Sequence, residues 1–235
     1  MQKKITGIIL AGGKGERAGG ALPKQFILLN RKPLLLYSLE KFQANPLITD
    51  IVVVTLKKYI SKVEALVKNN NIKKCCEIIE GGETRQESSF LGVGNAPSDT
   101  EYVVIHDSAR PFVTHKMIED TITAAIAIGS ATTAIEETNT IARSSSSGLM
   151  EEVLERKYIS IIQTPQAFRY DIIIEAHLLA KADAKSDFTD DAGLVLHYEH
   201  SERPIKIVAG HESNIKITNQ LDFELAECIL KNISK

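Results

Sequence analysis

This chain of 235 residues has few cysteines, a small net charge and no long apolar runs. Its three cysteines, Cys75, Cys76 and Cys228, are too few for a disulfide framework, and their spacing fits no zinc site. A formal net charge of −2 gives no bulk electrostatic support for binding to nucleic acid or to a membrane. Because no apolar run reaches membrane-spanning length and the first one is too short for a signal peptide, we expect a cytoplasmic protein.

Short apolar, β-branched segments alternate with helical patterns along the chain, and a hydrophobic content of 43% is enough for an ordinary folded core. The predicted strands are residues 4–10, 50–55, 77–80, 102–106, 131–135 and 205–209. The predicted helices are residues 33–43, 58–69, 84–92, 115–128, 171–182 and 219–233. Near-continuous apolar strands between helices predict one α/β domain over residues 1–235, with a mostly parallel sheet covered by helices on both faces. Cys75 and Cys76, at the start of the third strand, are expected to pack as small apolar side chains.

Residues 136–163 interrupt this alternation. Their polar centre, residues 144–148, lies between mixed segments, which predicts a hairpin or arm with a flexible tip. An arm that projects from a compact domain commonly contacts a second subunit, so we expect a dimer contact here. A solvated loop is the alternative.

The most informative segment is the glycine-rich turn after the first strand. Gly12, Gly13 and Gly15 follow an apolar run directly, and the basic side chains of Arg17 and Lys24 come next. Such a turn exposes backbone N–H groups and lets phosphate oxygens approach closely, while the cations add fixed positive charge. This combination predicts a triphosphate site, and a glycine turn with surface cations is the alternative.

Two other glycine-loop interpretations fit less well. The spacing of Gly13, Gly15 and Ala18 matches a loose dinucleotide fingerprint, but residues 33–39 lack the acid that it needs about 20 residues further on. A P-loop requires Ser or Thr after a Gly-Lys pair, and the sequence has no such arrangement. A nucleotidyltransferase loop is the interpretation that also accounts for the Pro-Lys-Gln motif at residues 23–25.

Polar side chains follow the predicted strand at residues 102–106. A carboxylate and a guanidinium three residues apart, Asp107 and Arg110, can hold a hydroxylated, anionic substrate. A structural ion pair at a turn is the alternative. The six histidines form no metal-ligand set, and His106 is expected to be structural rather than a catalytic base.

Two more groups are candidates for the same edge of the sheet. Gly82 and Ser88 belong to a second glycine turn and helix start, whose N–H groups can contact a base or ribose, or simply form a capped helix. Lys216 ends a predicted strand and alternates with two isoleucines, so its side chain should point away from them. The acids in the segment 189–192 suit the start of a helix through its dipole.

The ordered motifs along the chain are Ala11-Gly-Gly-x-Gly15-x-Arg17, Pro23-Lys24-Gln25, Gly82-x-x-Arg85-Gln86-x-Ser88, His106-Asp107-x-Ala109-Arg110-Pro111, Thr164-Pro165-Gln166, Thr189-Asp190-Asp191-Ala192 and Asn214-Ile-Lys216-Ile-Thr218. Together they resemble the 2-C-methyl-D-erythritol 4-phosphate cytidylyltransferases over nearly the whole chain. This resemblance implies a Rossmann-like nucleotide-diphospho-sugar transferase fold with a protruding β-arm, and a homodimer joined through that arm. It also implies Mg²⁺-dependent transfer of CMP from CTP to a polyol phosphate, with release of pyrophosphate, in non-mevalonate isoprenoid synthesis.

The resemblance implies roles for individual residues as well. The catalytic residues would be Arg17, Lys24, Arg156 and Lys216. Nucleotide contacts would come from Ala11, Gly12, Gly13, Gly15, Gly82 and Ser88. Substrate contacts would come from Asp107, Arg110, Thr140, Arg156, Lys216 and Thr218, with Thr140 and Arg156 reaching the neighbouring subunit's substrate. Mg²⁺ would be carried by the triphosphate, and no protein side chain is predicted to bind it.

Some residues depart from the family pattern. Asn139 and Ala142 stand in the arm where the family usually has aspartate and lysine, and Gly12 and Ala18 replace larger side chains near the nucleotide loop. Residues 163–166 also fit a sister family that transfers CMP to ribitol 5-phosphate. A non-catalytic nucleotide-binding protein on the same fold and a dinucleotide-dependent oxidoreductase are the remaining alternatives.

Overall fold

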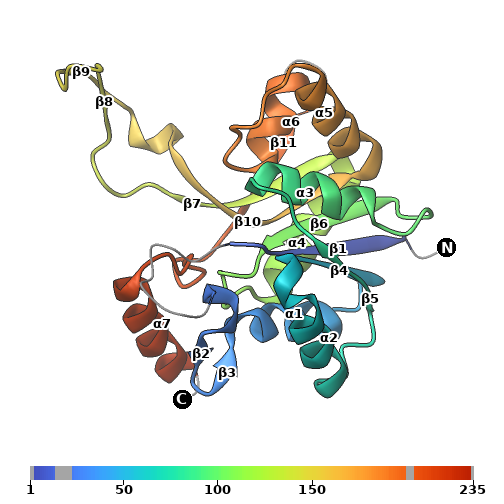
Figure 1. Ribbon diagram of the computed structural model, residues 1–235. Helices are drawn as coiled ribbons and strands as arrows, with labels where there is room; N and C mark the ends of the chain where they lie inside the picture. Colours follow the sequence, from blue (N-terminus) through green and yellow to red (C-terminus); the bar gives the residue numbers. More distant parts are fainter. Residues whose placement is uncertain (1–2, 14–22, 200–203, 234–235) are drawn as a thin grey trace.

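The computed structural model describes residues 3–13, 23–199 and 204–233 and is built around one seven-stranded sheet (Figure 1). In spatial order its strands are β11 (Ile205–Ala209), β7 (Ser130–Glu136), β10 (Ser160–Arg169), β6 (Tyr102–Asp107), β1 (Ile5–Ala11), β4 (Asp50–Thr55) and β5 (Cys75–Glu80). Strand β10 runs antiparallel to β6 and β7, whereas the other neighbouring pairs are parallel. The predicted mostly parallel sheet is therefore confirmed, and the six strands whose ranges were predicted are all present.

Strand β10 is the part of this sheet that sequence patterning does not predict. Its inner residues Gln163, Thr164 and Gln166 are polar, so it lacks the apolar run that marks the other strands. It is nevertheless buried, because it pairs with both β6 and β7 and its polar side chains bond inside the protein. Gln166, for example, donates to the hydroxyl of Thr132 in β7 at 3.0 Å. The predicted arm covers residues 136–163, and its last residues, 160–163, therefore belong to strand β10 of the sheet.

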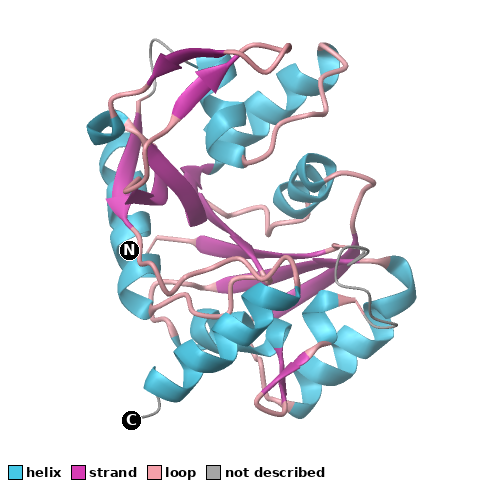
Figure 2. Ribbon diagram, turned by 90° about the vertical axis from the view of Figure 1, so that its left-hand side faces the viewer, coloured by secondary structure: helices cyan, strands magenta, loops and turns pink. Residues whose placement is uncertain are grey.

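Helices cover both faces of the sheet (Figure 1 and Figure 2). Helices α1 (Leu34–Ala44), α2 (Ile60–Asn69) and α4 (His115–Ile128) bury apolar residues on one face, and α3 (Arg85–Gly94), α5 (Tyr170–Ala182) and α6 (Asp191–Glu199) on the other. Strand β1 is buried throughout, because Ile9 faces the first set of helices and Ile8 the second. Across the described residues, each helix is too short or too polar to span a lipid bilayer.

A hairpin of β8 (Ala142–Ser144) and β9 (Met150–Val153) projects from the body of the molecule (Figure 1). It follows the end of β7 and leads back into β10, so the predicted protruding β-arm is confirmed. Apolar side chains of the arm are exposed, among them Leu149, Met150 and Tyr158, with exposed fractions of 70%, 72% and 76%. Within the described part of one chain, this apolar surface stays open to solvent.

A smaller apolar cluster lies beside the main sheet and orients Lys216. It joins helix α7 (Gln220–Ile233) to the short hairpin of β2 (Leu28–Leu29) and β3 (Lys32–Pro33). Ile217 is buried in this cluster and Ile215 packs against it, so Lys216 between them points to the other side. The predicted direction of Lys216 is confirmed, but the predicted strand is wrong, since residues 210–219 are irregular.

The two neighbouring cysteines do not both pack inside, contrary to expectation. Cys75 is half-buried, and burial raises its pKa to about 12, but Cys76 is exposed. The reason is a register shift between β4 and β5, where Ile51 pairs with Cys75 and Val52 pairs with Glu77. Cys76 is therefore the extra residue of a bulge on the edge strand.

Gly92 lets helix α3 lie close to the sheet. A Cβ atom at this position would come within 2.5 Å of Cγ2 of Ile8 and 2.8 Å of Cγ2 of Val54. Because α3 begins directly after the second glycine turn, this contact also determines where the start of the helix lies relative to β1.

Replacing Gly92 by alanine should lower the free energy of unfolding by about 1–3 kcal/mol, because the added methyl group overpacks the contact with β1 and β4. Gly94→Ala, at the end of the same helix, is the matched control, since nothing lies within 4 Å of its added Cβ. Urea unfolding followed by circular dichroism measures both variants. Equal stabilities would contradict the close packing of α3.

Candidate active site

A cleft of about 490 Å³ opens beside the carboxyl ends of β1 and β6. From β1 the chain continues to β4 on one side, and it later returns in β6 on the other side of β1. Open α/β sheets bind ligands at such a change of direction, because the loops after the two strands diverge there. The cleft is lined by Leu10, Gly12, Gly13, Lys24, Gln25, Gly82, Glu83, Thr84, Arg85, Ser88, Asp107, Ser108, Ala109, Lys216, Ile217 and Thr218.

Most of the predicted site residues in the described part of the chain meet in this cleft. They are Gly12, Gly13, Lys24, Gly82, Ser88, Asp107, Lys216 and Thr218. Ala11 is buried at the end of β1. Gly15, Arg17 and Ala18 lie outside the described residues. Arg110, Thr140 and Arg156 are described, but they do not line the cleft within one subunit.

Lys24 is held in a single 3₁₀ turn, Lys24–Phe26, that is anchored at the end of β1. The buried side chain of Gln25 donates from its amide to the backbone carbonyl of Ala11 at 2.6 Å, and Phe26 packs into the core. These contacts fix the backbone of Lys24, while its ammonium group lies in the cleft and donates to the carbonyl of Thr218. The sequence analysis assigned no role to Gln25. Its position in the Pro-Lys-Gln motif was the one feature of the sequence that could have pointed to this anchoring role.

The turn before α3 is shaped by side-chain caps. The hydroxyl of Thr84 accepts a hydrogen bond from the backbone N–H of Glu87 at 3.0 Å, and the carboxylate of Glu87 accepts one from the N–H of Glu83 at 2.8 Å. The hydroxyl of Ser88 donates to the carbonyl of Gly82 at 3.5 Å. The start of α3, with its partial positive charge, therefore faces the cleft.

Asp107, at the end of β6, is the centre of a chain of ion pairs. Its Oδ1 atom accepts from Nε of Arg85 at 3.0 Å, and its Oδ2 atom accepts from Nζ of Lys216 at 2.7 Å. Nη1 of Arg85 also donates to Oδ2 of Asp191 at 2.8 Å. Burial works against the charged form of Asp107, but Arg85 and then Lys216 outweigh it and hold its pKa well below the usual range. The carboxylate is therefore ionised at physiological pH.

His106, next to Asp107, has the structural role that was predicted. It is fully buried, and burial lowers its pKa to about 4. Its Nδ1 atom lies 3.0 Å from the hydroxyl of Thr164, and its Nε2 atom lies 3.1 Å from the carbonyl of Arg110. The hydroxyl of Thr164 also accepts from the backbone N–H of Asp107 at 3.1 Å, so β10 helps to hold the chain of ion pairs. Both ring nitrogens face groups inside the protein rather than the cleft.

Arg110 does not line the cleft but binds two segments next to it. Its Nη1 atom donates to the carbonyl of Asn214 at 2.8 Å, and its Nη2 atom donates to the carbonyl of Ile162 at 3.5 Å. Asn214 in turn donates from its side-chain amide to the carbonyl of Thr164 at 2.9 Å. These bonds tie the segment that carries Lys216 to β10. A direct contact between Arg110 and substrate stays a prediction.

Two predicted substrate contacts, Thr140 and Arg156, are exposed residues of the arm. Nη1 of Arg156 donates to the carbonyl of Thr138 at 2.9 Å, which joins the two sides of the arm near its base. Since neither residue lines the cleft of its own subunit, their predicted roles require a second copy of the chain.

The described residues offer no ligand set for a metal ion, since no group of three or more His, Cys, Asp or Glu side chains is placed to hold one. The buried acid of the cleft, Asp107, is already bound by Arg85 and Lys216. Within the described part of the cleft, this carboxylate is therefore already neutralised by its two cationic partners.

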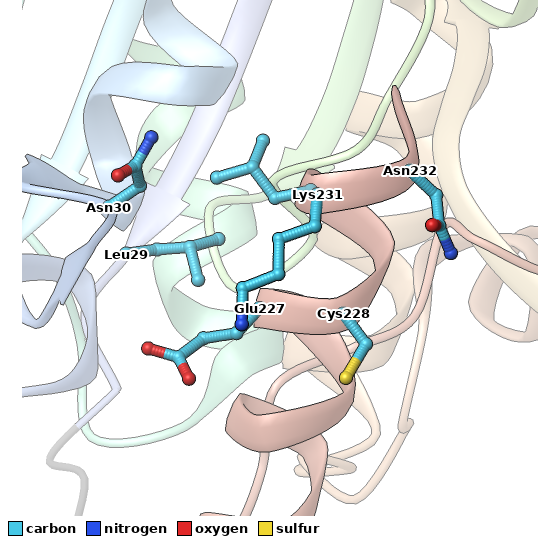
Figure 3. A pocket seen from close by; sticks show the side chains of 7 residues that line it. Leu29, Asn30, Glu227, Cys228, Lys231 and Asn232 are labelled. Atoms are coloured by element: carbon cyan, nitrogen blue, oxygen red, sulfur yellow. The ribbon is translucent and has the colours of Figure 1, made fainter. Parts of the chain in front are cut away.

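A second hollow, of about 660 Å³, lies between the β2–β3 hairpin and α7 (Figure 3). It is lined by Leu29, Asn30, Glu227, Cys228, Leu230, Lys231 and Asn232, none of which is a predicted site residue. Its charged side chains, Glu227 and Lys231, come from one exposed helix (Figure 3). The cleft beside β1 and β6 collects charged groups from separate elements and is therefore the better candidate for chemistry.

The chain is similar to known proteins over almost its whole length. The family model of the 2-C-methyl-D-erythritol 4-phosphate cytidylyltransferases matches residues 5–232. Proteins of that name from Clostridium novyi and Clostridium tetani are 40% and 38% identical over 231 residues, covering 98% of this chain and 98% and 92% of theirs. The crystal structure of 4-diphosphocytidyl-2C-methyl-D-erythritol synthase from Anaerococcus prevotii matches with a TM-score of 0.85 at 28% identity, covering 98% of this chain and 97% of that one. The chain belongs to the 2-C-methyl-D-erythritol 4-phosphate cytidylyltransferase family.

Proposed function

We propose that this protein transfers CMP from CTP to 2-C-methyl-D-erythritol 4-phosphate, giving 4-diphosphocytidyl-2-C-methyl-D-erythritol and pyrophosphate. The observation that carries the proposal is the cleft, which gathers a glycine turn, a helix start and the lysines Lys24 and Lys216 at one edge of the sheet. Backbone N–H groups, the helix dipole and ammonium groups all stabilise phosphate oxygens. Membership of the family supports this acceptor over ribitol 5-phosphate and an active enzyme over a binding protein.

The reaction requires no base from the protein. An oxygen of the acceptor phosphate, which is anionic at neutral pH, attacks the α-phosphorus of CTP. A new P–O bond forms there as the P–O bond to the leaving pyrophosphate breaks. The protein must supply positive charge that brings two anions together and stabilises the charge that develops at the α-phosphate. A buried, hydrogen-bonded His106 agrees with this chemistry.

Lys24 and Lys216 are assigned to different parts of this task. Lys24, beside the glycine turn, stabilises the developing charge at the α-phosphate, together with Arg17 in the segment outside the described residues. Lys216, held 2.7 Å from Asp107, binds the acceptor phosphate, and Asp107 accepts from hydroxyl groups. Mg²⁺ carried by CTP would add positive charge that screens the triphosphate oxygens.

The arm is assigned to a second copy of the chain. Thr140 and Arg156 lie outside their own cleft, and Leu149 and Met150 expose apolar surface that a homodimer would bury. In such a dimer, Arg156 and Thr140 of one subunit complete the acceptor site of the other.

Pyrophosphate release tests the proposed reaction directly. The purified protein with Mg²⁺ and CTP should release pyrophosphate when 2-C-methyl-D-erythritol 4-phosphate is added, and not when ribitol 5-phosphate is added. Release with ribitol 5-phosphate alone would assign the protein the sister activity. CTP binding without release with either acceptor would identify a non-catalytic protein.

Lys24→Ala should lower kcat by about 10²–10³-fold with the fold intact, because it removes one preorganised cation from the transition state. Lys116→Ala is the matched control, since Lys116 is an exposed lysine on α4 that pairs with Asp120. Steady-state pyrophosphate release and thermal melting compare the two variants. Near-normal turnover by a folded Lys24→Ala protein would remove Lys24 from the catalytic residues.

Arg156→Ala should raise KM for the acceptor and leave KM for CTP nearly unchanged, because the lost cation faces the acceptor phosphate.

Mixing Arg156→Ala with Lys24→Ala then tests whether the arm completes the partner's cleft. In that arrangement each mixed dimer has one intact site of two. At an acceptor concentration well below the KM of Arg156→Ala, random exchange should therefore restore about a quarter of wild-type activity, since half of the dimers are mixed. If arm and cleft of one subunit worked together, the mixture would stay impaired.

A further inference from the structure

Arg85 has none of the roles assigned so far, yet it binds two buried carboxylates at once. Its Nε atom lies 3.0 Å from Oδ1 of Asp107, and its Nη1 atom lies 2.8 Å from Oδ2 of Asp191. The two acids are 6% and 1% exposed. Arg85 begins α3, Asp107 ends β6 and Asp191 begins α6, so one guanidinium joins three elements at the wall of the cleft.

Asp191 is held firmly on its far side. Its Oδ1 atom accepts from the hydroxyl of Ser89 at 2.5 Å. Its backbone N–H and that of Ala192 both donate to the side-chain carbonyl of Gln166 at 3.1 Å. Burial opposes its charge, but Arg85, His177 and the hydroxyl of Ser89 together outweigh burial, and the pKa of Asp191 falls to about 2. Asp191 is thus a fixed, ionised anchor for Arg85 behind the cleft.

We propose that Arg85 is a positioning residue for the acceptor side of the cleft. Anchored on Asp191, it fixes Oδ1 of Asp107 and leaves Oδ2 to hold the ammonium group of Lys216 where the acceptor phosphate binds. This inference rests on the proposed cytidylyltransferase function and adds a residue that acts through Asp107 and Lys216.

The charge balance of the cluster explains why Lys216 depends on Arg85. Two carboxylates, Asp107 and Asp191, face two cations, Arg85 and Lys216. Without Arg85, Lys216 would be the remaining ion-pair partner of Asp107, and its ammonium group would be drawn toward Asp107 and away from the acceptor phosphate. A lysine cannot replace this arginine, because one ammonium group cannot bridge two carboxylates as the rigid fork of a guanidinium does.

Two titratable groups near Asp107 cannot take over the role of Arg85. Arg110 donates to backbone carbonyls, and His106, with its pKa lowered by burial to about 4, is neutral at working pH. On the far side, Nε2 of His177 lies 3.6 Å from Oδ1 of Asp191. Removing the guanidinium between the two carboxylates is therefore the change that most alters the surroundings of Asp107.

The experiment compares Arg85→Gln and Arg85→Lys with the wild type, using CTP and 2-C-methyl-D-erythritol 4-phosphate. In both variants kcat/KM for the acceptor should fall by about 10²-fold, since a displacement of about 1 Å is enough for such a loss. KM for CTP should change little. Arg169→Gln is the matched control, because Arg169 makes a comparable pair with Asp171, at 2.6 and 2.9 Å, on the surface.

The pH profile separates positioning from a general loss of structure. Arg85 contributes to the low pKa of Asp107, so its removal should raise that pKa. The acid limb of kcat/KM for the acceptor should then begin at a higher pH in Arg85→Gln than in the wild type, and shift less in Arg85→Lys, which keeps a cation. Equal losses for both substrates with an unshifted profile would overturn the proposal.

The wild type, assayed in parallel, separates this inference from the proposed function. A wild type that releases no pyrophosphate overturns the function, whereas an active wild type and an equally active Arg85→Gln overturn the role of Arg85. NMR titration of the Asp107 carboxyl carbon requires no turnover. The pKa of Asp107 should be higher in Arg85→Gln, and an unchanged pKa would count against the chain of ion pairs.

Discussion

The buried carboxylate of Asp107 is the group on which the arrangement of the cleft depends. A carboxylate that is 6% exposed at the end of a strand is stable only when cations and hydrogen-bond donors surround it. Arg85 and Lys216 bind its two oxygens, and the hydroxyl of Thr164 accepts from its backbone N–H. The start of α3, the segment before α7 and strand β10 must therefore converge on one point. The charges that stabilise the cleft also determine its shape.

Strand β10 shows how a polar segment can lie inside a sheet and serve the site. Because it runs antiparallel to β6, its residue Thr164 lies beside the carboxyl end of β6, where Asp107 is. Two positions further on, Gln166 donates to Thr132 and accepts from the first N–H groups of α6. The polar atoms of this strand are thus paired inside the protein, which removes the cost of burying them. The same bonds place Asp191 behind the cleft.

Local patterns were enough to predict the parallel strands and their helices, because burial on both faces makes such strands apolar over consecutive residues. The Pro-Lys-Gln motif likewise placed Lys24 at the site. The rest depends on pairs far apart in the chain, such as Arg85 with Asp191 across 106 positions and Lys216 with Asp107 across 109. The hydrophobic periodicity of a sequence does not indicate which distant residues form such pairs. Strand β10 escaped prediction for the same reason, since its polar residues find their partners only in the folded sheet.

The departure of the arm from the family pattern at Asn139 has a local physical reason. The carboxylate of Glu137 accepts hydrogen bonds from the backbone N–H and from the side-chain amide of Asn139, at 2.5 and 2.9 Å. Aspartate has no side-chain donor and would add a second negative charge beside Glu137, so this turn favours asparagine. Since Arg156 donates to the carbonyl of Thr138 in the same turn, Asn139 stabilises the backbone that accepts this hydrogen bond from the arm's guanidinium.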